Sequence, residues 1–338
     1  MACDVLSDVL RNVRLRGAVY YHVGGDTAWA AEAPAARDIA AVVMPGVEHV
    51  MEYHVLIRGE CWGSLVGDAP VRLQAGDILL FPHGDPHVMS SAPGMRVVPG
   101  AGAQFLRKNG QLPFLLAHEG TEGPRQVPGV DGYGTTLVCG FLGCDLRPFN
   151  PLVARLPRLL HLRASTEQAW IAHFIRHAVD ESTAKRAGGE AMLERMSEMM
   201  FIDAVRRYVD LLPPGSPGWL AGLRDPFVGK ALGLLHAQPG APWTPEELGR
   251  RIGLSRSALH ERFAAYIGQP PMQYLANWRM QVAANHLRDS NATVAAVALE
   301  VGYESEAAFS RAFKRLVGVC PAAWRRRHGR RDAALPEY

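Results

Sequence analysis

The sequence VGYESEAAFSRAFKRLVGVCPAAW, from Val301 to Trp324, decides how the C-terminal third of the chain folds. Gly302 is expected to end one short helix, and Ser305 can cap the next. Apolar residues then recur at helical spacing and predict one buried face: Ala308, Phe309, Ala312, Phe313 and Leu316. The residues left for the outer face are Glu306, Ala307, Ser310, Arg311, Lys314 and Arg315. A short helix of this kind can lie in the major groove of DNA, or it can be a solvated amphipathic helix.

The same helix-turn-helix pattern occurs once more upstream, and this repetition favours the DNA-binding alternative. Thr244 is a predicted N-cap, Pro245 stands at the first helical position and Glu247 completes a capping box. This helix should end at Gly253, and Ser255 should cap a second helix. The predicted inner face of that helix is Ala258, Leu259, Phe263 and Ile267. Between the two units, the stretch PMQYLANWRMQVAANHLRDS is long enough to form a rigid spacer helix.

The outer faces of the two second helices provide the predicted DNA contacts. These residues are Arg256, Ser257, His260, Arg262, Ser305, Glu306, Ala307, Ser310, Arg311 and Lys314. Glu261 lies on the same face of the first recognition helix. It can accept a hydrogen bond from a cytosine amino group, but it would repel a phosphate.

The region from Asp225 to His328 resembles the AraC/XylS family of bacterial transcription regulators. The matching residues are Ala276, Trp278, Arg279, Ala283, Leu287, the stretch GYESEAAFSRAFKR, Gly318, Pro321, Trp324 and Arg325. The resemblance implies that each recognition helix enters one of two successive major grooves of double-stranded DNA. It also implies that the spacer helix sets the separation of the two recognition helices.

The distribution of charge agrees with this prediction. The whole chain has 338 residues and a formal net charge of +3. From Pro226 onward there are 15 Lys and Arg against 9 Asp and Glu, so this part carries +6 and the preceding part −3. The excess of cations lies with the predicted DNA reader, as phosphate binding requires.

The N-terminal part changes from a short amphipathic helix, Asp4 to Val13, to a series of strands. The predicted strands are the runs AVYYHV, AAVVMP, HVMEYHVLI, CWGSLV, VRLQ, DILLFP, HVMSS and MRVVP. They are short, alternating or apolar, and broken by Gly, Pro and Asp, which predicts an antiparallel sandwich or barrel. Gly76 to His87 fits the second motif of the cupin superfamily, and Glu52 to Gly59 fits the end of the first. The resemblance covers Arg14 to Val98.

The cupin resemblance raises the question of a metal site. By the family pattern, the two first-motif histidine positions correspond to Gly46 and Glu48, so only Glu52 and His87 stand where ligands belong. Catalytic metal sites of this kind usually need three protein ligands. Three predictions remain open. A divalent metal could be held by Glu52, His54, His83 and His87, a ligand pocket could be lined by Glu52, His54, Trp62 and His87, or the histidines could be ordinary residues with satisfied hydrogen bonds. The departure from the family pattern favours the last two over the metal.

The five cysteines are Cys3, Cys61, Cys139, Cys144 and Cys320. Their odd number and the absence of a CxxC pair favour neither a disulfide framework nor a zinc finger. The resemblance extends to regulators that sense oxidants through cysteine, so Cys61, Cys139 and Cys144 are candidate sensors. Cys139 and Cys144 are five residues apart across an expected turn, where a disulfide is conceivable. The opposing expectation is that nearby Glu48 and Glu52 raise the thiol pKa.

The middle of the chain is predicted to connect the two parts. Pro93 to Gly134 is rich in Gly and Pro and should form loops, followed by a strand from Thr135 to Leu142. Two helices follow, one capped by Thr166 and one from Glu190 to Leu212. Apolar stripes on these helices, predicted as core or as a dimer surface, include Trp170, Phe174, Met196 and Met200. Pro213 to Gly218 should be the linker.

The sequence therefore predicts an all-β cupin-like barrel with a helical connector, followed by an all-α double helix-turn-helix. The predicted domains are a sensor barrel at 1–150, a helical connector and dimerisation segment at 151–217, and a DNA-binding domain at 218–330. The expected function is sequence-specific transcription regulation controlled by a signal in the barrel. One alternative is a metal-dependent cupin enzyme with a helical tail, and the missing histidines argue against it. A second alternative keeps the DNA reader but makes the barrel an oligomerisation module without a ligand.

The expected partners follow from this function. They are double-stranded DNA, a second copy of the chain, RNA polymerase, and a small molecule, a metal ion or an oxidant as the signal. The sequence contains no apolar run of the ~20 residues that cross a bilayer and no recognisable signal peptide. Neither a membrane partner nor a certain cofactor is predicted, and we expect a cytoplasmic protein.

Overall fold

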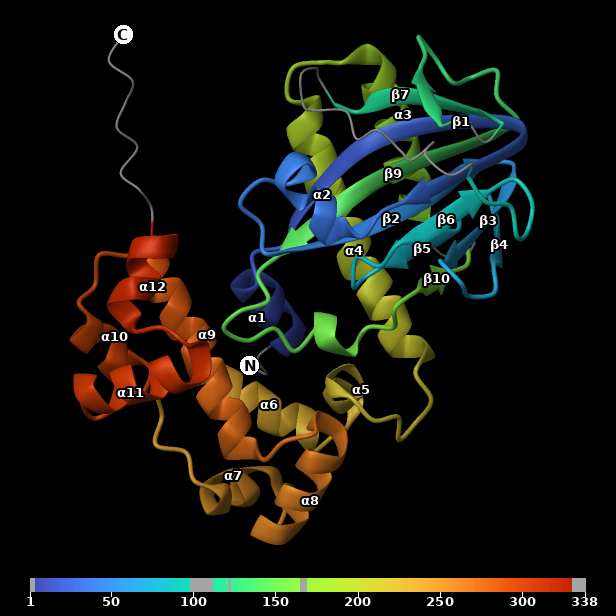
Figure 1. The fold of residues 1–338 in the computed structure, drawn as a ribbon. Helices are drawn as coiled ribbons and strands as arrows, with labels where there is room; N and C mark the ends of the chain where they lie inside the picture. The colour runs from blue at the N-terminus through green and yellow to red at the C-terminus, as the bar shows by residue number, and fades with distance from the viewer. Residues whose placement is uncertain (1–3, 98–111, 121–122, 165–168, 330–338) are drawn as a thin grey trace, which may run out of the picture. The chain divides into compact units, whose positions relative to one another are not determined.

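The computed structural model describes residues 4–97, 112–120, 123–164 and 169–329. The chain divides into two compact units. The barrel unit comprises Arg14–Asp145 and Leu156–Leu211, and the reader unit comprises Met1–Val13, Leu146–Arg155 and Leu212–Tyr338. The predicted fold class is confirmed, since strands dominate the first unit and helices form the second (Figure 1).

Strand β1 (Arg16–Ala33) organises the barrel unit because it belongs to two sheets. Its first half pairs antiparallel with β9 (Thr135–Cys144), and its last residues pair with β6 (His87–Ser90). Neighbouring strands follow the order β10-β5-β2-β9-β1-β6-β3-β4, while β7 adds to β1 in parallel and β8 pairs with β7. The remaining bounds are β2 His49–Arg58, β3 Glu60–Leu65, β4 Val71–Gln74, β5 Ile78–Phe81, β7 Phe114–Gly120, β8 Pro124–Gln126 and β10 Leu160–Leu162.

Helices α3 (Ala169–Ala184) and α4 (Gly189–Leu211) pack against β1 and β9 (Figure 1). The approach of α4 is close, because a Cβ atom on Gly17 of β1 would lie 2.5 Å from the carbonyl oxygen of Glu194. Deeper in the interface, the Tyr53 and Ser197 hydroxyls are 2.8 Å apart. Phe174 and Met200, predicted for a dimer surface or core, are fully buried inside this unit.

The reader unit contains the two predicted helix-turn-helix pairs. Its helices are α1 Val5–Asn12, α5 Trp219–Arg224, α6 Val228–Ala237, α7 Pro245–Ile252, α8 Arg256–Ile267, α9 Pro271–Asp289, α10 Val294–Glu300, α11 Glu306–Val317 and α12 Pro321–His328. The Ser255 and Ser305 hydroxyls accept the backbone N–H of the third following residue, both at 3.2 Å, so both predicted caps are formed. Gly253 and Gly318 end α7 and α11 in the left-handed conformation that favours glycine.

Two segments that flank the barrel in sequence pack within the reader unit. The Asn12 carbonyl, at the end of α1, accepts hydrogen bonds from the side chains of Gln281 and Asn285 on α9, at 2.8 and 3.0 Å. The Phe149 N–H donates to the Gln281 side-chain oxygen at 2.9 Å. From the sequence, both segments were expected in the sensor domain because they adjoin the barrel strands in sequence. Their hydrogen bonds to α9, which place them in the reader unit, are tertiary contacts that the sequence does not show.

Several sequence predictions in the barrel unit need correction. Residues Ala36–Val43 form helix α2, although the run from Ala40 to Pro45 was expected to be a strand. Burial of Ala36, Ile39 and Val43 follows helical rather than alternating spacing. The stretch 93–134, expected as loop, contains β7 and β8, and residues 95–97 of the expected strand MRVVP are not a strand. The predicted cap Thr166 lies outside the described residues. No helix in the described part of the chain is both long and apolar enough to cross a membrane.

Candidate DNA interface and sensor pocket

Helix α11 presents its predicted DNA-contacting side chains on an exposed face. Phe309 and Phe313 are completely buried and fix the helix to the core, which leaves the opposite side to solvent. Ala307, Arg311 and Lys314 follow the spacing i, i+4, i+7 and are exposed. Ser305 and Glu306 are exposed at its N-terminus, and Ser310 is half-buried. Among the described residues, Arg311 and Lys314 have no side-chain hydrogen bond or ion pair, so both cations are available to DNA.

Helix α8 carries cations that already have acidic partners. The Arg256 Nη1 atom lies 2.9 Å from Glu246 Oε1, and both side chains are exposed, so this pair adds little stability. Ser257, His260 and Glu261 are also exposed. The predicted face therefore exists on α8, but among the described residues its cations are paired with carboxylates, unlike those of α11.

Arg262 is bound more firmly than Arg256. Its Nη2 and Nε atoms lie 2.6 and 3.0 Å from the two carboxylate oxygens of Asp225, whose side chain is 3% exposed. Asp225 also accepts the N–H groups of Phe227 and Val228, at 3.1 and 2.9 Å, where α6 begins. This bidentate pair joins α8 to the start of α6, so Arg262 has a structural contact that sequence reasoning did not find.

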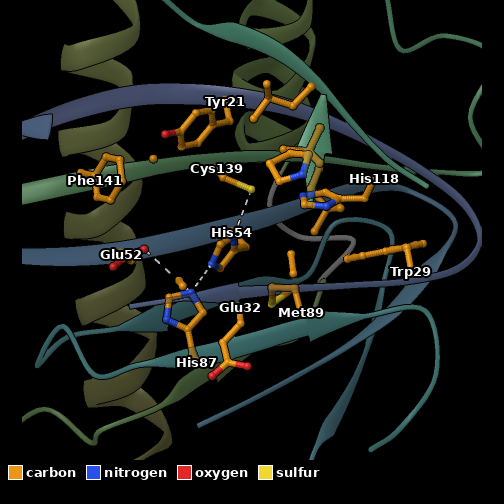
Figure 2. A pocket seen from close by; sticks show the side chains of 17 residues that line it. Tyr21, Trp29, Glu32, Glu52, His54, His87, Met89, His118, Cys139 and Phe141 are labelled. Atoms are coloured by element: carbon orange, nitrogen blue, oxygen red, sulfur yellow. Dashed lines mark hydrogen bonds and ion pairs between the residues drawn. The ribbon is translucent and has the colours of Figure 1, made fainter. Parts of the chain in front are cut away.

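A cavity of about 90 Å³ lies within the barrel unit (Figure 2). Strands β1, β2, β6, β7 and β9 supply most of its wall. The lining is mainly apolar and aromatic, with a few polar side chains: Tyr21, Val23, Trp29, Ala31, Glu32, Ala33, Glu52, His54, His87, Met89, Leu116, His118, Pro124, Leu137, Cys139, Gly140 and Phe141.

The structure brings the predicted residues Glu52, His54 and His87 together at this cavity (Figure 2). Glu52 and His54 alternate to the same face of β2, and His54 is paired in register with Cys139 of β9. The His54 Nδ1 atom is 2.9 Å from Cys139 Sγ, and its Nε2 atom is 2.8 Å from His87 Nε2. The His87 Nδ1 atom is 3.0 Å from the carbonyl oxygen of Asp85.

These contacts define the direction of a hydrogen-bond chain. The Asp85 carbonyl can only accept, so His87 Nδ1 carries a proton and, in the neutral ring, His87 Nε2 accepts. His54 Nε2 then donates to His87, and His54 Nδ1 accepts from the Cys139 thiol. Each ring uses one proton, and both histidines are neutral.

Burial determines the charge of the titratable groups in the cavity. It raises the pKa of Glu52 to about 8 and lowers the pKa of His87 to about 4. Burial also lowers the pKa of His54 well below its usual range, and that of His118 to about 4. At neutral pH Glu52 is therefore mostly protonated and these histidines are neutral. The 3.9 Å separation of His87 Nε2 and Glu52 Oε2 is accordingly not an ion pair.

The arrangement does not fit the metal centre that the cupin resemblance suggested. His54 Nε2 donates its proton to His87 Nε2, so the lone pair of His87 Nε2 accepts this hydrogen bond. The lone pair of His54 Nδ1 accepts from the Cys139 thiol, so neither ring has a free lone pair for a metal ion. Among the described residues, no three His, Cys, Asp or Glu side chains are placed to hold a metal ion. The fourth predicted ligand, His83, instead hydrogen-bonds through Nε2 to the Leu156 carbonyl oxygen at 2.9 Å and does not line the cavity.

Trp62, predicted to line the pocket, is not among the lining residues. Along β3 the side chains of Cys61 and Leu65 are buried, whereas Trp62 lies on the alternate face. The Arg72 guanidinium lies 5.8 Å from the centre of the Trp62 ring. No other described residue of β3 lines the cavity either, so the prediction of Trp62 as a pocket residue is wrong.

The candidate redox cysteines are buried. Burial, together with Asp77 and Glu60, raises the pKa of Cys61 to about 12, and burial also raises the pKa of Cys139. The reactive thiolate form is therefore disfavoured at both positions. Cys139 and Cys144 do not flank a turn, since both lie in the continuous strand β9. Five residues of extended chain span about 16 Å, so a disulfide between them is excluded in this fold.

Sequence reasoning missed Trp29 and His118, which stack with ring centroids 5.7 Å apart. The side-chain atoms Trp29 Nε1, His118 Nδ1 and Glu52 Oε1 are buried and have no hydrogen-bond partner in the described structure. Leaving such an atom unpaired costs about 1–3 kcal/mol. Alternation of Leu116 and His118 within Phe114–Gly120 was the available signal, but the surrounding Gly and Pro residues favoured a loop.

Comparison with known families agrees with the two-part organisation. Residues 4–210 match the family described as Cupin, and residues 248–327 match a helix-turn-helix domain family. An AraC-like transcription regulator of Streptomyces lividans is 32% identical over 325 residues, which cover 96% of this chain and 98% of the relative. The transcriptional regulator AlkR of Acinetobacter baylyi is 26% identical, with coverage of 95% and 99%.

Two further relatives cover less of the chain. The RCS-specific transcriptional activator RclR of Escherichia coli is 29% identical over 201 residues, 59% of this chain and 70% of the relative. Among solved structures, the DNA-binding domain of AdpA in complex with a target DNA is 29% identical. It covers 30% of this chain and 92% of that domain, with a TM-score of 0.29.

Proposed function

The chain belongs to the AraC family of transcription regulators, and on that premise we propose that it binds two successive major grooves through α8 and α11 and that a signal in the barrel changes this binding. One observation carries the proposal. Arg311 and Lys314 project from an exposed face of α11 that is fixed by two buried phenylalanines and a formed N-cap. An N-terminal turn that faces bases, followed by cations, suits a major groove.

The proposed DNA contacts follow from this geometry. On α11 they are Ser305, Glu306, Ala307, Ser310, Arg311 and Lys314, and on α8 they are Arg256, Ser257 and His260. Arg262 was among the DNA contacts predicted from the sequence. We assign it instead to holding α8 against the start of α6, because its Nε and Nη2 atoms donate to the two carboxylate oxygens of Asp225.

We further propose that the chain works as a dimer. The apolar side chains available for this on α4 are Met192 and Met199, which are 48% and 58% exposed and seven residues apart. They replace Phe174 and Met200, which are buried within the barrel unit. Linking two readers would raise their effective concentration on paired sites. Sedimentation of the full chain at micromolar concentration tests this, and a monomer with and without DNA would contradict it.

The remaining assignments are proposals as well. We assign residues 1–150 to a sensor domain, 151–217 to the connector and 218–330 to the DNA-binding domain, with the exception that Met1–Val13 and Leu146–Arg155 belong to the reader unit. We also infer a cytoplasmic regulator that contacts RNA polymerase. An enzymatic role has less support, because Gly46 and Glu48 stand where a catalytic cupin has histidines. The named relatives are transcription regulators.

A selection experiment with the full chain tests the DNA-binding proposal. Random double-stranded DNA would be selected for binding, and the enriched site would then be titrated in a mobility-shift assay. We expect an enriched motif with two segments about one helical turn apart. A protein that enriches no sequence would overturn the proposal. The variant Lys230→Ala, on the exposed surface of α6, is the matched control because it removes a cation outside both recognition helices.

A further inference from the structure

The cavity in the barrel has three buried polar atoms that find no hydrogen-bond partner among the described residues. Trp29, Glu52 and His118 are only 1%, 4% and 6% exposed, and each has one unpaired polar atom. All three line the same cavity, although they come from β1, β2 and β7. Native proteins rarely bury such atoms without a partner, so their convergence indicates that something else occupies this space.

The arrangement of these groups indicates a molecule with polar and apolar parts. Figure 2 shows Glu52 beside His87, and His118 near Trp29 at another part of the wall. Apolar side chains, including Leu116, Leu137 and Phe141, supply much of the remaining surface. Trp29 Nε1 can only donate a hydrogen bond, so the occupant must offer an acceptor atom.

The volume limits the size of the occupant. A buried water needs at least about 10–15 Å³ of such volume, so a cavity of about 90 Å³ has room for several waters or for one small organic molecule. Mainly apolar walls satisfy a water cluster poorly, because each water needs two to four polar partners. A compact organic molecule can use both the apolar walls and the polar atoms.

The charges of the wall favour an uncharged occupant. No Lys or Arg is among the described lining residues, so an anion would lack a counter-charge. The carboxylate of Glu32 is bound by Arg96 at 3.0 Å, and neither His54 nor His87 carries a net charge in the hydrogen-bond chain described above. A buried ion without a partner is strongly disfavoured.

We propose that the barrel cavity binds a small uncharged organic molecule whose carbonyl or hydroxyl oxygen is held by hydrogen bonds to Trp29 and His118. A second polar group of the molecule, where it has one, reaches Glu52. The inference rests on the proposed sensing role of the barrel, and it names the chemical class of the signal. His118 and Trp29 are then specificity-determining residues, since they select for the oxygen atom.

Matched probes of similar size test the charge and polarity of the ligand. Butan-2-one, butan-1-ol, butyrate, butylammonium and pentane would each be titrated into the full chain, with thermal unfolding and saturation-transfer NMR as readouts. We expect the ketone or the alcohol to raise the unfolding temperature saturably, because a ligand that binds only the folded state stabilises it. Equal or stronger binding of butyrate, butylammonium or pentane would overturn the proposal, as would no binding of any probe.

Variants identify the site. His118→Leu should weaken binding of the ketone or alcohol at least about tenfold, while the ligand-free protein keeps or gains stability because an unpaired polar atom is removed. His173→Leu, at an exposed position of α3, is the control and should bind normally. If His118→Leu does not fold, Trp29→Phe supplies the second test, and unchanged affinity for the ketone or alcohol in the folded variant overturns the assignment.

Zn²⁺ or Mn²⁺ alone forms a further arm of the experiment. Stabilisation by a metal ion that is lost in His54→Leu, without any response to the organic probes, would replace the proposal by a metal site. Affinity for the selected DNA, measured in the same samples, separates the two levels of inference. Ligand binding without any change in DNA affinity would leave the ligand assignment intact and reject the sensing function.

Discussion

The side chains that carry the proposed function of the reader unit are exposed, whereas those that carry the proposed function of the barrel unit are buried. Arg311 and Lys314 are exposed on a helix, so their removal should change their surroundings little. Glu52, His54 and His118 are buried inside the barrel, where strands distant in sequence surround each side chain. Substitutions in the first group should therefore affect DNA binding alone, while those in the second should also affect stability.

The same contrast recurs on a smaller scale between α8 and α11. Both are capped helices of 12 residues with buried apolar faces. The cations of α8 bind Glu246 and Asp225, but Arg311 and Lys314 of α11 have no such partners among the described residues. Electrostatic attraction to DNA should consequently depend more on α11, and α8 should contribute through its fit in the groove.

Acidification should cause the largest loss of stability among these tests, and it should destabilise mainly the barrel unit. Burial lowers the pKa of His22, His87 and His118 to about 4, against an ordinary value of 6.5. Between these values the unfolded state binds more protons, so stability falls as the pH falls. Glu52, whose pKa burial raises to about 8, acts in the opposite sense. We expect a net loss of more than about 3 kcal/mol between pH 7 and pH 5, because His54, whose pKa burial also lowers, adds to the loss.

Differential scanning calorimetry of the full chain at both pH values measures this loss. The stability of the reader unit should fall less. Among its described residues only one histidine is buried, His236, whose pKa burial lowers to about 3. His118→Leu should reduce the pH response of the barrel. Equal losses of stability in both units between pH 7 and pH 5 would contradict the expected difference between them.

Asp225→Ala should destabilise the reader unit by about 2.5 kcal/mol. The substitution leaves Arg262 without its partner and removes the acceptor for two N–H groups at the start of α6. Urea unfolding of the purified chain checks the value. Glu246→Ala removes only the exposed partner of Arg256 and should change stability by less than about 0.5 kcal/mol. Similar losses in both variants would show that the two arginine contacts are equivalent.

Arg311→Ala should cost about 2 kcal/mol of DNA-binding free energy and relax the preference for one base pair. Its stability should not change, since the side chain makes no contact that the fold needs. Mobility-shift titrations against the selected site and its single-base variants provide the test. Specific binding that is untouched by the substitution would remove Arg311 from the base-reading set.

Lys314→Ala should have the smallest effect, about 1 kcal/mol, and it should weaken all DNA sequences alike. Loss of one phosphate contact lowers the slope of log affinity against log salt concentration by about one. Titrations at several salt concentrations measure this slope, with Lys230→Ala as control. A loss confined to one sequence would mean that Lys314 reads a base.

The features that sequence alone predicted are those that depend on neighbouring residues. The caps at Ser255 and Ser305 join atoms three residues apart, and the buried phenylalanines of α11 follow a local period. Glu52 and His54 were placed together because strand alternation is also local. The family resemblance added His87, which is 33 residues from His54.

The features that the sequence did not predict depend on tertiary contacts. Arg262 resembles any exposed cation of a recognition helix until Asp225, 37 residues earlier, is brought to it. Trp62 was predicted to line the ligand pocket and His83 to bind a metal, but their orientation is set by the pairing of β3 and by the Leu156 carbonyl. His118 needed the pairing of β7 with β1, and no local pattern encodes it.

The packing of α1 and of the segment around Phe149 on α9 has a consequence for where the reader unit can be cut from the chain. β1 starts four residues after Asn12, and β9 ends five residues before Phe149, and these two strands pair at Arg16 and Gly143. Both strands also line the cavity, while Gln281 of α9 hydrogen-bonds to both Asn12 and Phe149. A fragment that begins at Leu212 would therefore lack two segments that belong to the reader unit, and it would leave Gln281 without these two backbone partners.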